Sequence, residues 1–311
     1  MAADMEGPLV ALSNGLAEAV QHGGRSVVAI HGRPRVGSSG VIWSPGVVLT
    51  ADHTLRREDG IRVTLPDGRT VAAELAGRDS GTDLAVLKTE PIEAPALQEH
   101  SQTNRNGVQA GNLTLVVGRS EDSGVNASLG MISSVSGPWR TWRGGQMDQF
   151  VRLDAAVHPG SSGGAVLDAH GQFLGLATLG LSRLSPFVIP SSTIHRVAAA
   201  LLEKGHIARG FLGVGLQPVG LPDHLTAKLG IPGKSGLIVL SVEPGAPAGQ
   251  AGVVIGDILV ALDGTPVEDT DDVQAVLSAD YVGKLVKASI SRGGELIELG
   301  ITIGERPRRR A

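Results

Sequence analysis

One histidine, one serine and two aspartates in the first two thirds of the chain have the types that activate a hydroxyl for attack. Ser162 lies in a glycine-rich turn, and His53 ends a run of apolar residues. A serine hydroxyl is a weak nucleophile until an imidazole takes its proton, and the imidazole needs a carboxylate to fix its tautomer. Asp83 and, four residues earlier, Asp79 could supply that carboxylate. These residue types predict acyl transfer to Ser162 with His53 as the base.

The glycines around Ser162 meet a second need of this chemistry, which is a set of donors for an oxyanion. The turn reads Gly160-Ser161-Ser162-Gly163-Gly164. Glycine at 160 lets the backbone turn so that its N–H and that of Ser162 point to one spot. The sequence therefore predicts an oxyanion hole built from the N–H groups of Gly160 and Ser162.

The composition limits the other classes of function. The 311 residues are 41% hydrophobic and 19% charged, which suits about two folded domains. The chain has no cysteine, so disulfides, thiolate nucleophiles and cysteine-ligated metals are excluded. A net charge of −4 argues against a broad nucleic-acid surface. No nucleotide motif is present, and we expect no metal or cofactor.

Short β-branched runs separated by turns must position these residues. One set of runs fills residues 26–88 and a second fills 112–190, which predicts two β units side by side. Helical spacing predicts one helix within an N-terminal segment, 1–24, and another over 191–204 that Gly205 ends. We assign residues 25–204 to one mainly β domain and 205–209 to a linker.

The last third of the chain has a pattern of its own. Residues 210–304 contain strand-like runs, a short helix over 271–278 and a further helix near 221–230, which indicates a compact mixed α/β module. Residues 305–311 form a basic tail, which we expect to be solvated. Its arginines are Arg306, Arg308, Arg309 and Arg310.

Taken together, these motifs resemble the chymotrypsin-like HtrA (Deg) serine proteases. The turn around Ser162 follows RLDAAVH, and LTADH and TDLAVLK stand upstream of it. The order His, Asp, Ser is that of chymotrypsin-type enzymes. The resemblance covers residues 20–304 and implies a mainly β fold, a chymotrypsin-like double β-barrel followed by a PDZ domain. It favours Asp83 over Asp79, because the family's acid directly precedes LAVLK.

The chain departs from the family pattern at three positions. Ser161 replaces the usual asparagine and differs from the aspartate with which digestive enzymes hold a newly cut N-terminus. His158 stands where the family usually has asparagine, and we expect a loop residue there. Asp52 directly precedes His53, and because adjacent strand residues point opposite ways we expect it to face outward.

The resemblance also implies peptide-binding residues in both domains. Ala156, six residues before Ser162, would form the base of an uncharged specificity pocket, which Leu179 and Leu181 would line unless they are core leucines. In the PDZ domain the resemblance places a carboxylate-binding loop and its strand at Phe211, Leu212, Gly213 and Val214. The helix that forms the other wall would contribute Val273 and Leu277, again unless these belong to the core.

The function implied by the resemblance is a serine endopeptidase of protein quality control. It would cleave unfolded or damaged proteins after small aliphatic residues by an acyl-enzyme mechanism, with C-terminal or apolar peptides binding the PDZ domain. The alternative is a chaperone or PDZ adaptor on a protease-like scaffold. A homotrimer is implied, and the loop with Trp139 and Trp142 would help to regulate the site or pack locally. Relatives are periplasmic or tethered to a membrane, although residues 1–24 show no export signal, so the cytoplasm stays open.

Overall fold

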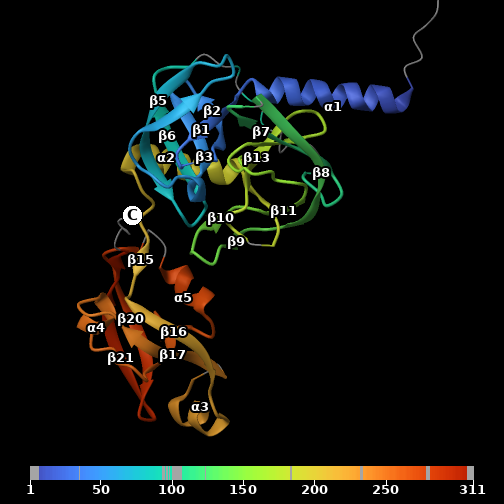
Figure 1. The fold of residues 1–311 in the computed structure, drawn as a ribbon. Coiled ribbons are helices and arrows are strands. Elements are labelled where there is room, and N and C mark those ends of the chain that lie inside the picture. The colour runs from blue at the N-terminus through green and yellow to red at the C-terminus, as the bar shows by residue number, and fades with distance from the viewer. Residues whose placement is uncertain are drawn as a thin grey trace, which may run out of the picture. The chain divides into compact units, whose positions relative to one another are not determined.

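The computed structural model describes residues 7–34, 36–92, 95, 97, 99, 107–122, 124–182, 184–231, 234–277 and 281–306. Backbone contacts divide the chain into two compact units, Met1–Ile207 and Ala208–Ala311 (Figure 1). Each unit is described by itself.

The first unit contains two closed six-stranded antiparallel barrels. The first barrel has the strand order β1-β2-β3-β6-β5-β4, and the second has the order β11-β14-β13-β12-β7-β8 (Figure 1). The first is built from β1 (Val27–His31), β2 (Ser38–Ser44), β3 (Val47–Ala51), β4 (Ile61–Thr64), β5 (Thr70–Asp79) and β6 (Leu84–Thr89). The second is built from β7 (Leu113–Ser120), β8 (Gly124–Ser136), β11 (Phe150–Asp154), β12 (Ala165–Asp168), β13 (Phe173–Thr178) and β14 (Phe187–Pro190), and β9 (Trp139–Arg140) and β10 (Gln146–Met147) form a small hairpin beside it.

Three apolar clusters hold this unit together. One fills the first barrel and includes Val28 and Ile30, and another fills the second barrel and includes Val116. The third cluster joins Leu49 of the first barrel to Leu176 of the second. Burying such a side chain stabilises the fold by about 1.5–3 kcal/mol. The third cluster therefore fixes the two barrels against each other.

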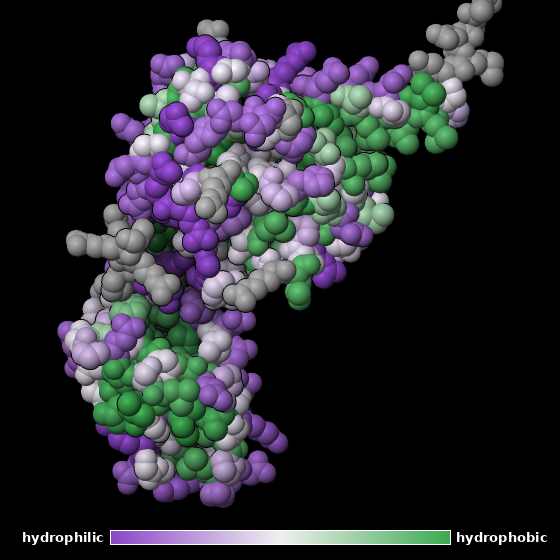
Figure 2. Space-filling model, in the orientation of Figure 1, coloured by the Kyte–Doolittle hydropathy of each residue, from purple (hydrophilic) through white to green (hydrophobic). Residues whose placement is uncertain are grey.

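Two helices accompany the barrels, and both were predicted. Helix α2 (Ser191–Lys204) packs on the cluster between the barrels and ends at Gly205, whose φ of 75° closes the last turn. Helix α1 (Pro8–Gly24) buries few residues, and Leu9 is 81% exposed. Apolar surface marks the free end of α1 in Figure 2. Within the described residues, no helix is long and apolar enough to cross a membrane.

The second unit is a six-stranded antiparallel sheet, in which the short β19 pairs only with β18, together with short helices. The sheet order is β16-β17-β18-β20-β21, so β16 stands at an open edge. Its strands are β16 (Val214–Gly220), β17 (Ser235–Val242), β18 (Ile258–Leu262), β20 (Leu285–Arg292) and β21 (Glu295–Thr302), with the short β15 (Gly210–Phe211), β19 (Thr265–Pro266) and β22 (Gly304–Glu305). The helices are α3 (Asp223–Leu229), α4 (Pro247–Gln250) and α5 (Thr270–Val276).

Helix α5 begins where the sequence predicts it. Asp269 caps the helix through hydrogen bonds from the N–H groups of Asp271 and Asp272, and the Asp272 side chain returns the bond to the Asp269 N–H. Residue 278, the last of the predicted helix, lies outside the described residues, as do Arg308, Arg309 and Arg310 of the tail. The predicted fold class, mainly β with two barrels and a mixed α/β module, is confirmed.

One buried ion pair supports the second unit. Asp257 is 1% exposed, and its Oδ1 and Oδ2 accept hydrogen bonds from Arg292 Nε and Nη2 at 2.7 and 2.8 Å. The Val254 N–H also donates to Oδ2 at 2.9 Å. Burial by itself would raise the pKa of Asp257, but these hydrogen bonds and the Arg292 charge outweigh burial and hold the pKa below its usual value.

We predict that Asp257→Asn lowers the free energy of unfolding of the second unit by about 1–3 kcal/mol at pH 7, because it removes the buried carboxylate that accepts hydrogen bonds from the partly exposed Arg292 and from the Val254 N–H. Since the pKa of Asp257 is lowered in the folded state, this stabilisation is present above the ordinary aspartate pKa of about 3.9 and is lost as the pH falls through the folded value. Thermal unfolding of both proteins between pH 7 and pH 3 measures the difference. Glu243→Gln, which removes an exposed carboxylate, is the control, and equal losses in the two variants would contradict the prediction.

Candidate active site

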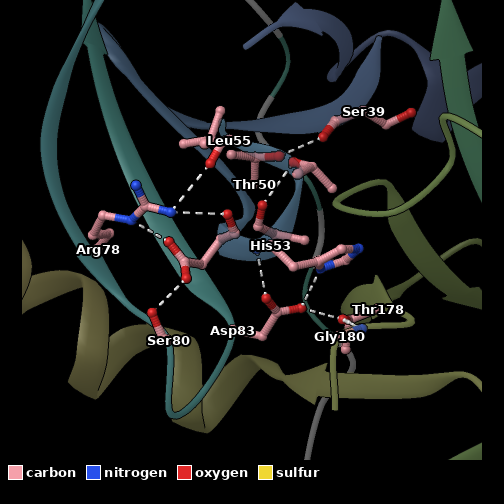
Figure 3. A network of polar contacts seen from close by, with 12 residues as sticks. Ser39, Thr50, His53, Leu55, Arg78, Ser80, Asp83, Thr178 and Gly180 are labelled. Carbon is pink, nitrogen blue, oxygen red and sulfur yellow. Dashed lines mark hydrogen bonds and ion pairs between the residues drawn. The ribbon is translucent and has the colours of Figure 1, made fainter. Parts of the chain in front are cut away.

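His53 and the buried Asp83 form a hydrogen-bonded pair in the first barrel, with the His53 ring partly exposed. The histidine lies in a 3-10 turn, Asp52–Thr54, directly after β3, and Asp83 directly precedes β6. Asp83 Oδ2 lies 2.8 Å from His53 Nδ1, and Asp83 Oδ1 accepts the His53 N–H at 2.8 Å (Figure 3). The carboxylate therefore fixes the ring through Nδ1 and leaves Nε2 as the nitrogen that can accept a proton.

The second barrel completes the surroundings of Asp83. The Thr178 hydroxyl, at the end of β13, donates to Asp83 Oδ2 and accepts the Gly180 N–H at 2.8 Å (Figure 3). A Cβ added at Gly180 would lie 2.4 Å from Asp83 Oδ2 and 2.6 Å from His53 Nδ1. Sequence reasoning did not find Thr178 or Gly180, because they are 95 or more residues from Asp83 and belong to no motif there.

The neighbouring aspartates have structural roles. Asp79, the rival acid, accepts hydrogen bonds from the N–H groups of Gly81 and Thr82 and so holds the turn before Asp83. The prediction that Asp52 faces outward is wrong: it is 2% exposed, and its carboxylate accepts Arg78 Nε at 2.5 Å and the Ser80 hydroxyl at 2.7 Å.

Ser162 lies where the second barrel meets β2 and β3 of the first. Its carbonyl accepts the Ser39 N–H at 3.1 Å, and Ser39 O in turn accepts the Thr50 hydroxyl at 2.7 Å. The next residue, Gly163, is packed so tightly that a Cβ would lie 2.3 Å from Ser39 O and 2.9 Å from Ala51 N. These contacts place Ser162 beside the strand end that carries His53.

The residues before Ser162 form a tight turn. The Ser161 N–H donates to His158 O at 2.9 Å, and Gly160 has a φ of 95°. A four-residue turn with proline second and a positive φ at the third residue is a type II turn. His158 is exposed at its start, as expected of a loop residue. In a type II turn the peptide between the second and third residues, here Pro159 and Gly160, is flipped relative to a type I turn.

Two hydrogen bonds anchor this turn to other strands. The Ser39 hydroxyl donates to Gly160 O at 2.7 Å and accepts the Arg119 N–H at 2.9 Å. The Ser161 hydroxyl donates to Asn126 Oδ1 on β8 at 2.8 Å. Ser161 stands where digestive enzymes have the aspartate that holds a new N-terminus, and its hydroxyl bonds to a side chain of the barrel instead.

The residues expected to form the specificity pocket have different environments. Ala156 is exposed, Leu179 is 42% exposed, and Leu181 is 6% exposed and belongs to the cluster between the barrels. In the adjacent loop, Trp139 packs against Phe150, with ring centres 5.2 Å apart, whereas Trp142 is 73% exposed. Among the described residues, no three His, Asp or Glu side chains cluster in a way that would hold a metal ion.

The second unit presents the predicted loop and helix wall. Gly213 has a φ of 75°, and a Cβ there would lie 2.1 Å from Ala246 Cβ, so the loop depends on glycine. Phe211 is half-buried, Val214 opens β16 beside α5, and Leu277 follows that helix. Leu212 and Val273 are 4% and 3% exposed and lie in the core of the unit.

The fold and the site define a chymotrypsin-like serine-protease scaffold joined to a PDZ domain. Comparison with family models agrees: residues 38–176 match the trypsin-like peptidase domain and residues 210–303 match the PDZ domain. A Lactobacillus helveticus protein, "Serine protease Do-like HtrA", is 30% identical over 85% of this chain and 68% of its own length. The chain belongs to the HtrA family of serine proteases.

Other relatives agree with this assignment. A Brucella suis protein named "Probable periplasmic serine endoprotease DegP-like" is 34% identical over 89% of this chain, and the chain spans 54% of its length. Among solved structures, "HtrA-type protease AlgW with decapeptide" superposes with a TM-score of 0.74 at 28% identity, covering 94% of this chain and 99% of that one. The resemblance stated from the motifs is thereby confirmed, as are the double barrel and the PDZ domain.

We predict that Gly180→Ala lowers kcat/KM for a peptide substrate about 100-fold, because the added methyl displaces the His53–Asp83 pair by about 1 Å. The measurement is the steady-state rate on a quenched peptide, with circular dichroism to show an unchanged fold. Gly137→Ala is the matched control, since a Cβ there meets nothing within 4 Å. An unchanged rate in Gly180→Ala would mean that the pair does not act in the reaction.

Proposed function

We propose that this chain is a serine endopeptidase that hydrolyses peptide bonds through an acyl-enzyme. The observation that supports it best is the hydrogen-bonded Asp83–His53 pair, joined through Nδ1, beside a serine that follows an anchored type II turn. Acyl transfer needs a base with a fixed tautomer and preorganised oxyanion donors, and this arrangement can supply both.

In the proposed mechanism, His53 Nε2 takes the proton of the Ser162 hydroxyl as its oxygen attacks the substrate carbonyl. Asp83 orients the ring and stabilises its cationic form. The N–H groups of Gly160 and Ser162 donate to the oxyanion. His53 then gives the proton to the leaving amine, and water attacks the acyl-enzyme with the same base.

For substrates, we infer cleavage of unfolded or damaged proteins after small aliphatic residues. Ala156 offers no charge for a lysine or arginine side chain, and the exposed Leu179 adds apolar surface. A quality-control role follows from this preference together with the PDZ domain. The related AlgW is described with a decapeptide, and the open edge of β16 beside α5 suits a peptide added as a further strand.

We also infer self-association as a homotrimer and a periplasmic location, the latter from the name of the Brucella relative. Leu9, Val10 and Leu12 of α1 are 81%, 48% and 50% exposed, and exposed apolar side chains of this kind favour association. We predict that sedimentation of the purified chain gives three times the monomer mass. A monomer at micromolar concentration would contradict the trimer.

The peptidase proposal predicts that the protein digests β-casein and that Ser162→Ala lowers the rate about 10⁴-fold or more. Mass spectrometry of the fragments should show cleavage after Val, Ala or Leu. A peptide with an apolar free C-terminus is added in a parallel arm, so that a resting enzyme is also detected. Ser136→Ala, at an exposed position on β8, is the matched control.

A folded protein that cleaves nothing in either arm would contradict the peptidase proposal. If it nevertheless suppressed aggregation of casein, it would be a binding protein on a protease scaffold. Unchanged cleavage by Ser162→Ala would show that Ser162 is not the nucleophile. Cleavage only after lysine or arginine would contradict the inferred role of Ala156 and leave the peptidase proposal standing.

A further inference from the structure

A separate cavity of about 520 Å³ adjoins the turn before Ser162. Pro159 and Gly160 form one wall. Among the described residues, the other walls come from Ala29, His31, Arg33, Val36, Gly37, Arg57 and Arg62 of the first barrel and its loops and from residues 119–122 of the second. Gly160 lines the cavity and also provides a proposed oxyanion donor, so the cavity adjoins the proposed reaction centre.

The cavity is basic. Among its described lining residues are four arginines and two carboxylates, a surplus of two positive charges. The arginines are Arg33, Arg57, Arg62 and Arg119, and the carboxylates are Glu121 and Asp122. One of the two carboxylates, that of Glu121, contacts a histidine as well, since its Oε2 lies 3.6 Å from His31 Nδ1. A surplus of guanidinium groups in a hollow surface favours an anionic ligand.

Two of the arginines shape the wall of the cavity. Arg33 donates to Val36 O at 2.7 Å and to Gly37 O at 3.1 Å. Arg119 likewise donates to Val27 O and Gly24 O. In these bonds both side chains pair with carbonyl groups and not with carboxylates, so their charges stay uncompensated. Burial lowers the pKa of the Arg33 guanidinium, and the nearby charge of Arg56 lowers it further.

The other two arginines are placed to hold a ligand. Arg57 follows the turn that carries His53, and Arg62 lies on β4; both are exposed at the cavity. A guanidinium can bind a carboxylate through two parallel hydrogen bonds. Exposed arginines therefore can meet an arriving carboxylate without breaking a structural contact.

The cavity and the inferred specificity pocket are formed by different residues. Among the described residues, the lining includes none of Ala156, Leu179 and Leu181. The segment with Leu179 follows β13 and lies close to His53 at Gly180. The cavity is lined instead by Arg33, Val36 and Gly37, which lie between β1 and β2, and by Arg57 and Arg62. A substrate chain that leaves the specificity pocket and passes Gly160 enters this cavity with the residues after the scissile bond.

Resting on the peptidase function proposed above, we propose that this cavity is a subsite for a carboxylate on the leaving-group side of the substrate, held by Arg57 and Arg62. An extended chain advances about 3.3 Å per residue, so the second residue after the scissile bond reaches beyond Gly160. The carboxylate is the side chain of a glutamate or aspartate there, or the free C-terminus of a short leaving peptide.

The test uses quenched peptides that share one sequence before the scissile bond. The second residue after it is Glu, Gln or Lys in C-terminally amidated peptides, and a fourth peptide ends there with Gln and a free carboxylate. We expect kcat/KM to be about tenfold higher for the Glu peptide than for the Gln peptide and lowest for the Lys peptide. The preference for Glu should shrink in 0.5 M salt, because the Debye length there is only about 4 Å. If kcat/KM is higher for the fourth peptide and not for the Glu peptide, the carboxylate that binds is the free C-terminus.

The double variant Arg57→Gln/Arg62→Gln should bring the carboxylate and Gln peptides within about twofold of each other and leave the Gln peptide's rate unchanged. Arg69→Gln, whose guanidinium pairs with Asp67 in its own turn, is the control and should keep the full preference. Equal rates for all four peptides, or a preference that survives the double variant, would overturn the subsite.

A separate readout distinguishes failure of the subsite from failure of the peptidase proposal. If the protein cleaves none of the peptides, the peptidase proposal fails, and fluorescence anisotropy then measures binding of the same peptides to Ser162→Ala. Tighter binding of a carboxylate peptide than of the amidated Gln peptide, lost in the triple variant that also carries Arg57→Gln and Arg62→Gln, would support the subsite. Equal binding of these peptides would overturn it.

Discussion

The carboxylate of Asp83 is buried where the two barrels meet, and much of the first unit satisfies its oxygens. The first barrel contributes the His53 N–H and ring, and the second contributes the Thr178 hydroxyl. A buried carboxylate without such partners costs several kcal/mol. The barrels must therefore dock in one arrangement, and the cluster that joins Leu49 to Leu176 supplies the apolar contacts that hold it.

That same arrangement brings the turn before Ser162 against β2. Ser39 lies at the centre, since its N–H meets Ser162 O, its hydroxyl meets Gly160 O, and its carbonyl accepts the Thr50 hydroxyl. Asn126 holds the turn from its other side through Ser161. The proposed base and the proposed nucleophile thus come from different barrels, and the hydrogen bonds of Ser39 join the turn before Ser162 to the first barrel.

Local signals in the sequence predicted much of this structure. Residue types predicted His53 and Ser162, and the family resemblance was needed to choose Asp83 over Asp79. Helix α2 ends at Gly205 because the left-handed backbone there favours glycine. Long-range partners such as Thr178 and Asn126 could not be found, because nothing near them in the sequence records which strand they will face. Asp52 was misjudged because strand alternation does not apply to a 3-10 turn.

Apolar residues at the two peptide-binding regions show a second limit. Leu181 and Val273 are spaced as groove residues would be, yet both are buried in cores. Periodicity identifies the face of a strand or helix that avoids water, and it does not say whether protein or peptide covers that face.

Asp83 also has an unusual backbone, with a φ of 58°. Among residues with a side chain, aspartate and asparagine adopt this conformation most readily. Two requirements thus limit the residue types that suit position 83, which are a negative charge beside His53 and a backbone with positive φ. One nucleotide separates the aspartate and asparagine codons, so a single mutation can keep a residue type suited to this backbone while it removes the negative partner of His53. Loss of activity with retention of the fold is therefore one of the shortest paths open to this gene.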